Sequence, residues 1–175
     1  MIVEPKVFGD ARGYFFESYN EKLFFEAGIQ AVFRQDNQSF SKYGVIRGLH
    51  FQNNPHSQTK LIRVLEGVIN DVVLDMRKGS PTFGKCFALE LSADNKRQLY
   101  IPTGFAHGFS VLSEQAAIFY KCDNFYHPQS EGGVFYNDPA LGIDWKVDAA
   151  KAIISEKDRN LPTFYQVETN FVYQP

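Results

Sequence analysis

The sequence has few cysteines and no long hydrophobic run. Cys86 and Cys122 are its only cysteines and do not form a CxxC pair, so the fold must do without a disulfide framework, and buried, inert thiols in a reducing compartment are expected. The longest apolar runs, such as residues 72–74, fall far short of the roughly 20 residues that span a bilayer. No charged start precedes an apolar stretch, as it would in a signal peptide. We therefore expect a cytoplasmic protein with no membrane partner.

The sequence also has no large excess of positive or negative charge. The chain has 18 basic and 20 acidic residues and a formal net charge of -2, with the two signs mixed along its length. Such a balance gives no electrostatic footprint for nucleic acid. We expect no nucleic-acid partner, and any anionic ligand must be met by a local cluster of cations.

Aromatic residues are abundant, with 17 Phe and 9 Tyr among 175 residues, which favours strands over a helical bundle. One short helix is predicted over residues 20–27, with Asn20 as its cap and Gly28 as its stop. From there to residue 120, short apolar segments alternate with turn signals, as in a β-sandwich or barrel. The length fits a single domain over residues 1–175, with ordered loops after residue 123 and an aromatic tail from residue 164 that packs on the barrel or on a second subunit.

The segment 68–76 places two carboxylates on a half-apolar strand face. Residues two apart share a face of a strand, so Asp71 and Asp75 point to the same side. Asp71 lies in mid-strand and is expected to need a buried partner. Asp75 lies near the turn, where a solvated position is the simpler expectation.

Two of the four histidines, His50 and His107, lie in strand-like apolar segments. A lone strand histidine is more often structural than catalytic. Here, however, the same segments carry Arg47, Lys60 and Asp71, more ionisable groups than a barrel core normally holds. A functional cavity is therefore predicted.

The Pro102-x-Gly104-x-x-His107 spacing is similar to the second sequence motif of cupins, in which the histidine often binds a metal. The first motif would need His-x-His and a later Glu, whereas this chain has His50-x-Gln52 and no Glu at the expected interval. A typical transition-metal site uses three or four ligands. A metal-free barrel is the better prediction.

Eight short strings occur in the same order as the signature segments of one enzyme family. They are EPKVFGDARG (4–13), QDNQS (35–39), GVIRGLH (44–50), SPTFG (80–84), GFAHGF (104–109), YK (120–121), NDP (137–139) and SEKD (155–158). Each string alone is weak, but the ordered set resembles the dTDP-4-dehydrorhamnose 3,5-epimerases over most of the chain.

The resemblance implies a mainly β fold of the cupin type, a double-stranded β-helix or jelly-roll barrel with a few short helices, assembled as a homodimer. It implies inversion of C3 and C5 of dTDP-4-dehydro-6-deoxy-D-glucose without a cofactor or metal. By matching motifs, His50 is the base, Asp158 orients it, Tyr120 is the acid on the opposite face, and Lys60 stabilises the enolate. The further positions implied to bind substrate are Arg12, Glu17, Gln35, Asp36, Asn37, Arg47, His107, Tyr126, Glu131 and Lys157, with Asp71 behind them.

One geometric condition follows from the proposed site. Arg47 and His50 have opposite parity and would face opposite sides of a regular strand, so we predict a bulge at Gly48 that turns both inward. The alternatives are an epimerase acting at C3 or C5 alone, a non-catalytic sugar-nucleotide-binding cupin and, last, a metal-dependent cupin.

Overall fold

The computed structural model describes residues 1–174. Its helices are short: α1 (Glu21–Glu26), α2 (Glu156–Arg159) and the 3-10 turns η1 (Pro128–Ser130) and η2 (Ala149–Lys151). The strands are β1 (Ile2–Val3), β2 (Phe8–Asp10), β3 (Gly13–Phe15), β4 (Gln35–Lys42), β5 (Val45–Gln52), β6 (Lys60–Glu66), β7 (Val68–Asp75), β8 (Cys86–Ser92), β9 (Gln98–Ile101), β10 (Phe105–Val111), β11 (Gln115–Cys122), β12 (Glu131–Gly133) and β13 (Ile153–Ile154). The predicted mainly β fold is confirmed.

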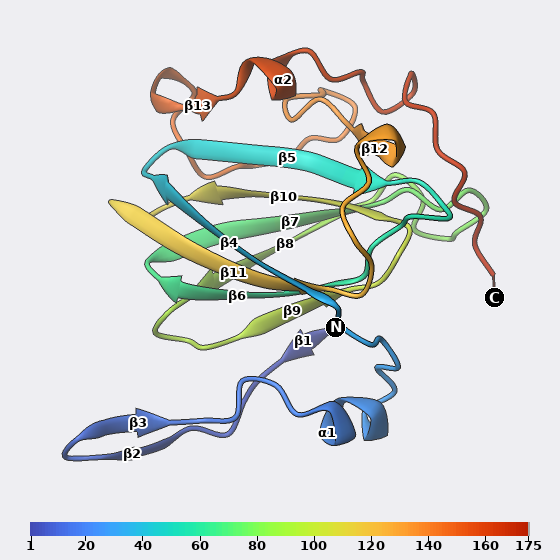
Figure 1. The fold of residues 1–175 in the computed structure, drawn as a ribbon. Helices are drawn as coiled ribbons and strands as arrows, with labels where there is room; N and C mark the ends of the chain where they lie inside the picture. Colours follow the sequence, from blue (N-terminus) through green and yellow to red (C-terminus); the bar gives the residue numbers. More distant parts are fainter. Residues whose placement is uncertain (175) are drawn as a thin grey trace.

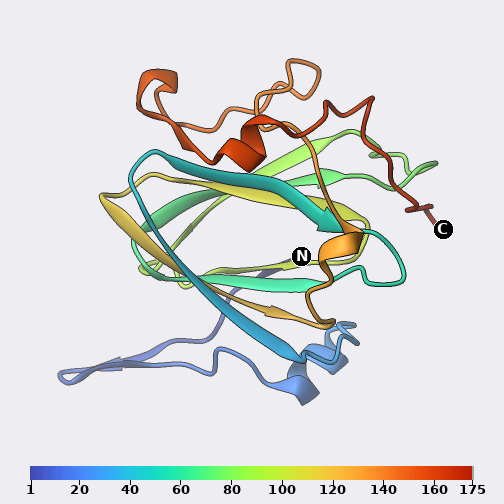
Figure 2. The ribbon, with the colours of Figure 1, turned by 45° about the horizontal axis from the view of Figure 1, so that its top comes forward.

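Two facing sheets form a barrel of the jelly-roll type (Figures 1 and 2). One sheet has the order β1-β9-β6-β11-β4, and the other has the order β12-β5-β10-β7-β8, with β13 added in parallel beside β5. Non-consecutive neighbours such as β5 and β10 pair antiparallel. Strands distant in sequence therefore lie side by side within one sheet of the barrel.

The apolar side chains form two layers, one on each face of the β5-β10-β7 sheet. Between the two sheets lies a cluster that includes Ile62, Ile69 and Ile118. On the outer face, Val72 and Leu74 pack beneath the C-terminal segment. The strand alternation of β7 explains this division, because successive side chains point to opposite faces.

The C-terminal segment is part of this outer layer. Phe164 and Phe171 are buried against the sheet, and Val172 pairs with Lys78. The expectation that the aromatic tail packs on the barrel is confirmed. Among residues 1–174, no helix is long and apolar enough to cross a membrane.

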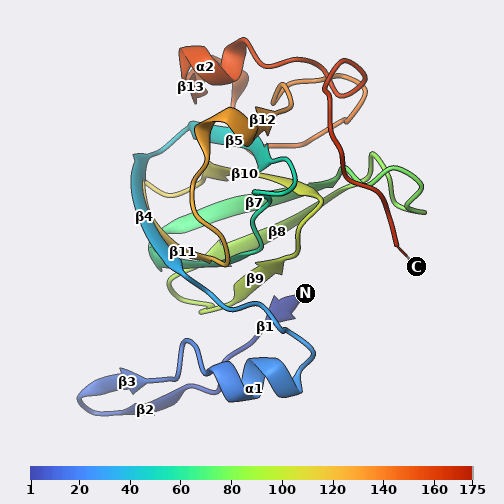
Figure 3. The same cartoon turned by 45° about the vertical axis from the view of Figure 1, so that its right-hand side comes forward.

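The N-terminal arm, residues 1–34, lies outside the barrel except for β1, which forms the edge of one sheet. β1 pairs with β9, whereas the β2–β3 hairpin extends away from both sheets (Figure 3). The predicted helix is confirmed as α1: Asn20 caps it by accepting a hydrogen bond from the Leu23 amide, and Gly28 follows it with a φ of 87°.

The expectation of a solvated Asp75 is wrong. Its carboxylate is 1% exposed and accepts hydrogen bonds from Arg77, Ser80 and Thr82, because the turn after β7 folds back over it. Burial alone would raise the pKa of Asp75, but these donors, led by Arg77, outweigh burial and lower it to about 2. Of the two free thiols, Cys122 is buried and Cys86 is only partly so.

Candidate active site

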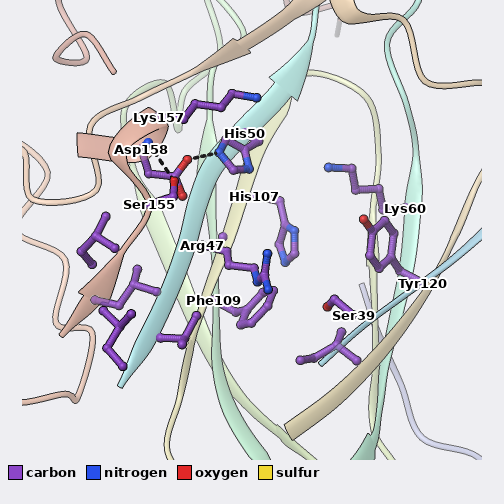
Figure 4. Close-up of a pocket in the computed structure, with 16 residues that line it drawn as sticks. Ser39, Arg47, His50, Lys60, His107, Phe109, Tyr120, Ser155, Lys157 and Asp158 are labelled. Atoms are coloured by element: carbon purple, nitrogen blue, oxygen red, sulfur yellow. Dashed lines mark hydrogen bonds and ion pairs between the residues drawn. The ribbon is translucent and has the colours of Figure 1, made fainter. Parts of the chain in front are cut away.

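A cavity of about 550 Å³ opens between the two sheets. A second depression of about 350 Å³ adjoins it and shares His50, Lys60 and Tyr120 with it. The predicted site residues that line the cavity are Arg47, His50, Lys60, His107, Tyr120, Lys157 and Asp158 (Figure 4). Those that line only the depression are Gln35, Asn37, Tyr126 and Glu131.

Strand β5 contributes two of these residues through an irregularity at Gly48. His50 pairs with His107 but Arg47 pairs with Phe109, so β5 uses one more residue than β10 between the two pairs. Gly48 has a φ of 120°, and a Cβ there would lie 2.6 Å from the Gly108 Cα, so only glycine fits. The predicted bulge is confirmed, and both Arg47 and His50 face the cavity (Figure 4).

A buried carboxylate orients His50. Asp158 Oδ1 lies 2.7 Å from His50 Nε2, and its Oδ2 accepts a hydrogen bond from the Gly48 amide at 3.2 Å. Burial would raise the pKa of Asp158, but hydrogen bonding and the charge of His50 outweigh it and lower the pKa below its usual value. Asp158 therefore stays ionised, and the Nδ1 atom of His50 is left for a ligand in the cavity.

Lys60 and Tyr120 form the opposite wall. They come from β6 and β11, and Figure 4 shows both side chains across the cavity from His50. Burial lowers the pKa of Lys60 and raises the pKa of Tyr120. The Tyr120 phenol thus keeps its proton at neutral pH and can donate it.

His107 reaches the cavity from β10 and is held from behind. Its Nε2 lies 2.9 Å from the Asp71 Oδ2, and Asp71 is fully buried. The expectation that Asp71 needs a buried partner is confirmed. Among the described residues, the other oxygen of Asp71 has no hydrogen-bond partner.

The adjoining depression carries a polar network around Tyr126. Its hydroxyl donates to Glu131 at 3.0 Å, and its amide donates to the Gln35 side chain at 3.0 Å. Lys157 completes the network with a 2.7 Å ion pair to Glu131. Tyr126 is 54% exposed as a whole residue, so its ring is accessible to a flat ligand that could stack on it.

Three of the residues predicted to bind substrate line neither the cavity nor the depression within this chain. Asp36 points to the opposite face of β4 and pairs with Lys121 at 2.8 Å. Arg12 is at the exposed tip of the β2–β3 hairpin, paired with Asp10 at 2.6 Å, and Glu17 follows that hairpin in the N-terminal arm. Strand alternation explains Asp36, because Gln35 and Asn37 occupy the inward positions on either side of it.

The same alternation reveals a residue that the sequence analysis did not assign. Ser39 is two positions beyond Asn37, lines the cavity, and has a buried hydroxyl without a hydrogen-bond partner among the described residues. Apolar residues complete the floor, among them Phe109 and Ile118. These have no sequence signal of their own, because an inward apolar residue is equally typical of a core.

The arrangement offers an imidazole and a phenol on opposite sides of one cavity, with an amine beside the phenol (Figure 4). A base on one face and an acid on the other can remove a proton from a carbon and return one from the other side. A cation stabilises the negative charge that develops on a neighbouring carbonyl oxygen. Within residues 1–174, no group of three or more His, Cys, Asp or Glu side chains is placed to hold a metal.

Comparison with known proteins identifies the family. The family model described as dTDP-4-dehydrorhamnose 3,5-epimerase matches residues 1–166. The dTDP-4-dehydrorhamnose 3,5-epimerase of Salmonella typhimurium is 52% identical over 167 residues, which are 95% of this chain and 91% of that protein.

Solved structures agree. The crystal structure of the epimerase from Elizabethkingia anophelis is 58% identical with a TM-score of 0.90, over 94% of this chain and 90% of that one. The enzyme of Legionella pneumophila, in complex with dTDP-4-keto-L-rhamnose, is 46% identical with a TM-score of 0.95, over 99% of this chain and 93% of that one. With this match in sequence and fold, the chain belongs to the dTDP-4-dehydrorhamnose 3,5-epimerase family.

Proposed function

We propose that this chain, as a single epimerase domain over residues 1–175, inverts C3 and C5 of dTDP-4-dehydro-6-deoxy-D-glucose to give dTDP-4-dehydro-L-rhamnose, in dTDP-L-rhamnose biosynthesis. One observation carries the proposal: His50 and Tyr120 face each other across one cavity, with Lys60 on the same wall as the phenol. The names of the relatives support the same activity. The enzyme is thus a carbohydrate epimerase.

The chemistry follows from the substrate's ketone. A 4-keto group acidifies the hydrogens on both adjacent carbons, so the reaction needs no redox cofactor or metal. His50 Nδ1 takes the proton from carbon, while Asp158 stabilises the imidazolium that forms. Lys60 donates a hydrogen bond to the developing enolate oxygen. Tyr120 then returns a proton from the other face, which inverts the centre.

We place the nucleotide part of the substrate beside Arg47 and in the adjoining depression. Gln35, Asn37 and Arg47 bind the diphosphate region through amide and guanidinium donors. Tyr126 stacks on the thymine ring. The remaining residues proposed to contact substrate are His107, Glu131 and Lys157.

Incubation with dTDP-4-dehydro-6-deoxyglucose in deuterated water tests the function. Nuclear magnetic resonance of the product should show deuterium at both C3 and C5, with both centres inverted. Label at one carbon alone would identify a single-site epimerase. Tight binding of dTDP without any label would identify a non-catalytic binding protein.

We further propose that the chain acts as a homodimer in which the N-terminal arms are shared. The β2–β3 hairpin exposes Phe8, Tyr14 and Phe15, and the outer face of the β4–β11–β6 sheet exposes Phe40 and Leu65. Exposed apolar patches of this kind mark protein interfaces. An arm extended from one subunit would also bring its Arg12 and Glu17 to the cavity of the other.

Mixing two inactive variants tests the shared arm. Arg12→Ala and His50→Ala should each lose activity alone. If each active site combines a barrel with its partner's arm, a mixed dimer contains one intact site and one site with both substitutions. Half of the dimers formed by random pairing are mixed, so about a quarter of full activity should return. Native mass spectrometry verifies that mixed dimers form. Mixed dimers without restored activity would show that Arg12 does not act in the partner's site.

We also propose a cytoplasmic location. Cys86 and Cys122 are both free thiols, which suits a reducing compartment. Cell fractionation with an antibody against the chain tests the location.

A further inference from the structure

Gln52 is a buried amide that the proposed reaction does not use. It is the last residue of β5, two positions beyond His50, and is only 5% exposed. It occupies the second position of the His-x-His pattern that a metal-binding cupin would place there. A buried amide must satisfy its hydrogen bonds within the protein, so its partners show what it does.

The Gln52 side chain makes three hydrogen bonds, all to backbone groups of two loops. Its Nε2 donates to the carbonyl oxygen of His56 at 2.6 Å and to that of Phe125 at 3.2 Å. Its Oε1 accepts from the amide of His127 at 2.9 Å. Two of these contacts therefore hold the residues immediately before and after Tyr126.

Other contacts join the same two loops. The imidazole rings of His56 and His127 stack with 3.7 Å between their centroids and 7° between their planes. The Gln58 side chain donates to the carbonyl oxygen of Asn124 at 2.8 Å. Of these side chains, only Gln52 bonds to both residues that flank Tyr126, Phe125 and His127. Gln35 and Glu131 hold Tyr126 itself.

We propose that Gln52 is a positioning residue for the nucleotide base: it holds Tyr126 in the orientation in which its ring stacks on a flat heterocycle. The inference rests on the proposed function, because it presupposes a nucleotide in the adjoining depression. Its physical basis is preorganisation. A loop fixed before binding does not lose conformational freedom when the ligand arrives, so more of the stacking energy appears as affinity.

Binding of dTDP, measured by isothermal titration calorimetry, tests the inference with Gln52→Met, which keeps the side-chain volume and removes every hydrogen bond. Stacking of a base on an aromatic ring contributes about 1–3 kcal/mol, so Tyr126→Ala should raise the Kd by about 5- to 150-fold. Gln52→Met should raise it by about 5- to 30-fold, in the lower part of that range. In steady-state kinetics, KM should rise while kcat stays unchanged.

The matched control is Asn70→Leu. Asn70 is a fully buried amide whose side chain donates to the carbonyl oxygen of Asp144 and so ties down a different loop. Asn70→Leu and Gln52→Met should both lower the melting temperature, but Asn70→Leu should leave the Kd for dTDP unchanged. Gln52→Asn keeps the amide on a stem too short to reach both loops. It should also raise the Kd, and it replaces Gln52→Met if that variant does not fold.

The deciding measurement is the double variant. If Gln52 acts through Tyr126, then Gln52→Met should change the Kd by less than about twofold when Tyr126 is already alanine. Equal losses in both backgrounds, or an unchanged Kd in the single variant, would overturn the inference and leave the proposed function intact. Failure of the unmodified protein to bind dTDP would instead remove the proposed function and the inference together.

Discussion

Replacing Asp158 with asparagine keeps His50 in place but removes the carboxylate that orients it. The variant therefore tests how much that orientation contributes to the reaction. In the folded chain, Asp158 accepts two donors, the His50 imidazole at 2.7 Å and the Gly48 amide at 3.2 Å, one on each oxygen. Asparagine has one oxygen and therefore satisfies only one of them. If that oxygen stays on Gly48, the new NH₂ group faces His50 Nε2 and requires it to be unprotonated. The imidazole proton then sits on Nδ1, the atom that must accept the substrate's proton.

The expected loss of rate follows from the hydrogen bond between Asp158 and His50 that the substitution removes. A hydrogen bond to a charged group contributes about 1.5–3 kcal/mol, and the Asp158 carboxylate makes such a bond to the imidazolium formed in the transition state. Its removal should lower kcat by about 10- to 150-fold, and the unfavourable tautomer adds to this loss. KM should change little, because Asp158 is only 3% exposed and acts through its hydrogen bond to His50.

The assay is the rate of deuterium incorporation at C3 and C5 in deuterated water. Glu156→Gln is the matched control, since it removes an exposed carboxylate from the same helix, α2, and should retain the full rate. Circular dichroism and the melting temperature verify that both variants fold. An Asp158→Asn rate within about threefold of the unmodified protein would refute the orienting role, because the transition-state bond would then be worth less than about 1 kcal/mol.

Further predictions concern three other side chains. Tyr120→Phe should still exchange substrate hydrogens with deuterated water but should not invert the labelled centres, as chiral analysis of the product would show; normal inversion would assign the acid to another residue. Lys60→Met should lower kcat by about 100-fold without lowering the melting temperature, because it removes a buried ammonium. Burial lowers the pKa of Lys60, so Lys60 should lose its proton at a pH below the usual lysine pKa. The activity of the unmodified protein should therefore fall before the pH reaches the usual lysine pKa. A pH profile that stays flat up to that pH would contradict the role of the Lys60 ammonium. Asp75→Asn should reduce the free energy of unfolding at pH 7 by about 2 kcal/mol, as urea titration measures. Because the folded pKa of Asp75 is about 2, the difference should shrink as pH falls from 4 toward 2, and a difference independent of pH would refute it.

Local patterns in the sequence predicted the parts of the fold that depend on neighbours along the chain. The cap at Asn20, the mid-strand burial of Asp71 and the bulge at Gly48 each follow from the conformations that a few adjacent residues allow. Alternation along β4 also separates Gln35 from Asp36, although the motif match alone had grouped both as substrate-binding residues.

Contacts that form when a loop folds back on its own strand were harder to predict from the sequence. Asp75 was expected in solvent because it precedes a turn, yet residues 77–82 return to cover it with Arg77, Ser80 and Thr82. The length and polarity of a turn do not reveal whether it will fold back on its own strand. Gln52 is a second case: its partners are backbone groups of two loops, which no side-chain pattern identifies.

The pairing of His50 with Asp158 shows why a site can be named from motifs before it can be explained from physics. The two residues are 108 positions apart, and nothing in the periodicity around residue 158 predicts a neighbour in β5. The explanation lies in β13, where Ile153 and Ile154 pair in parallel with Val45 and Ile46. Within the next few residues, Ser155 caps α2 by accepting a hydrogen bond from the Asp158 amide, which turns the carboxylate back toward Gly48 and His50. A two-residue strand and a one-turn helix are too short to be predicted from propensity. They are stable only because the barrel is already there to pair with, so the orientation of His50 depends on the docking of this C-terminal segment onto β5.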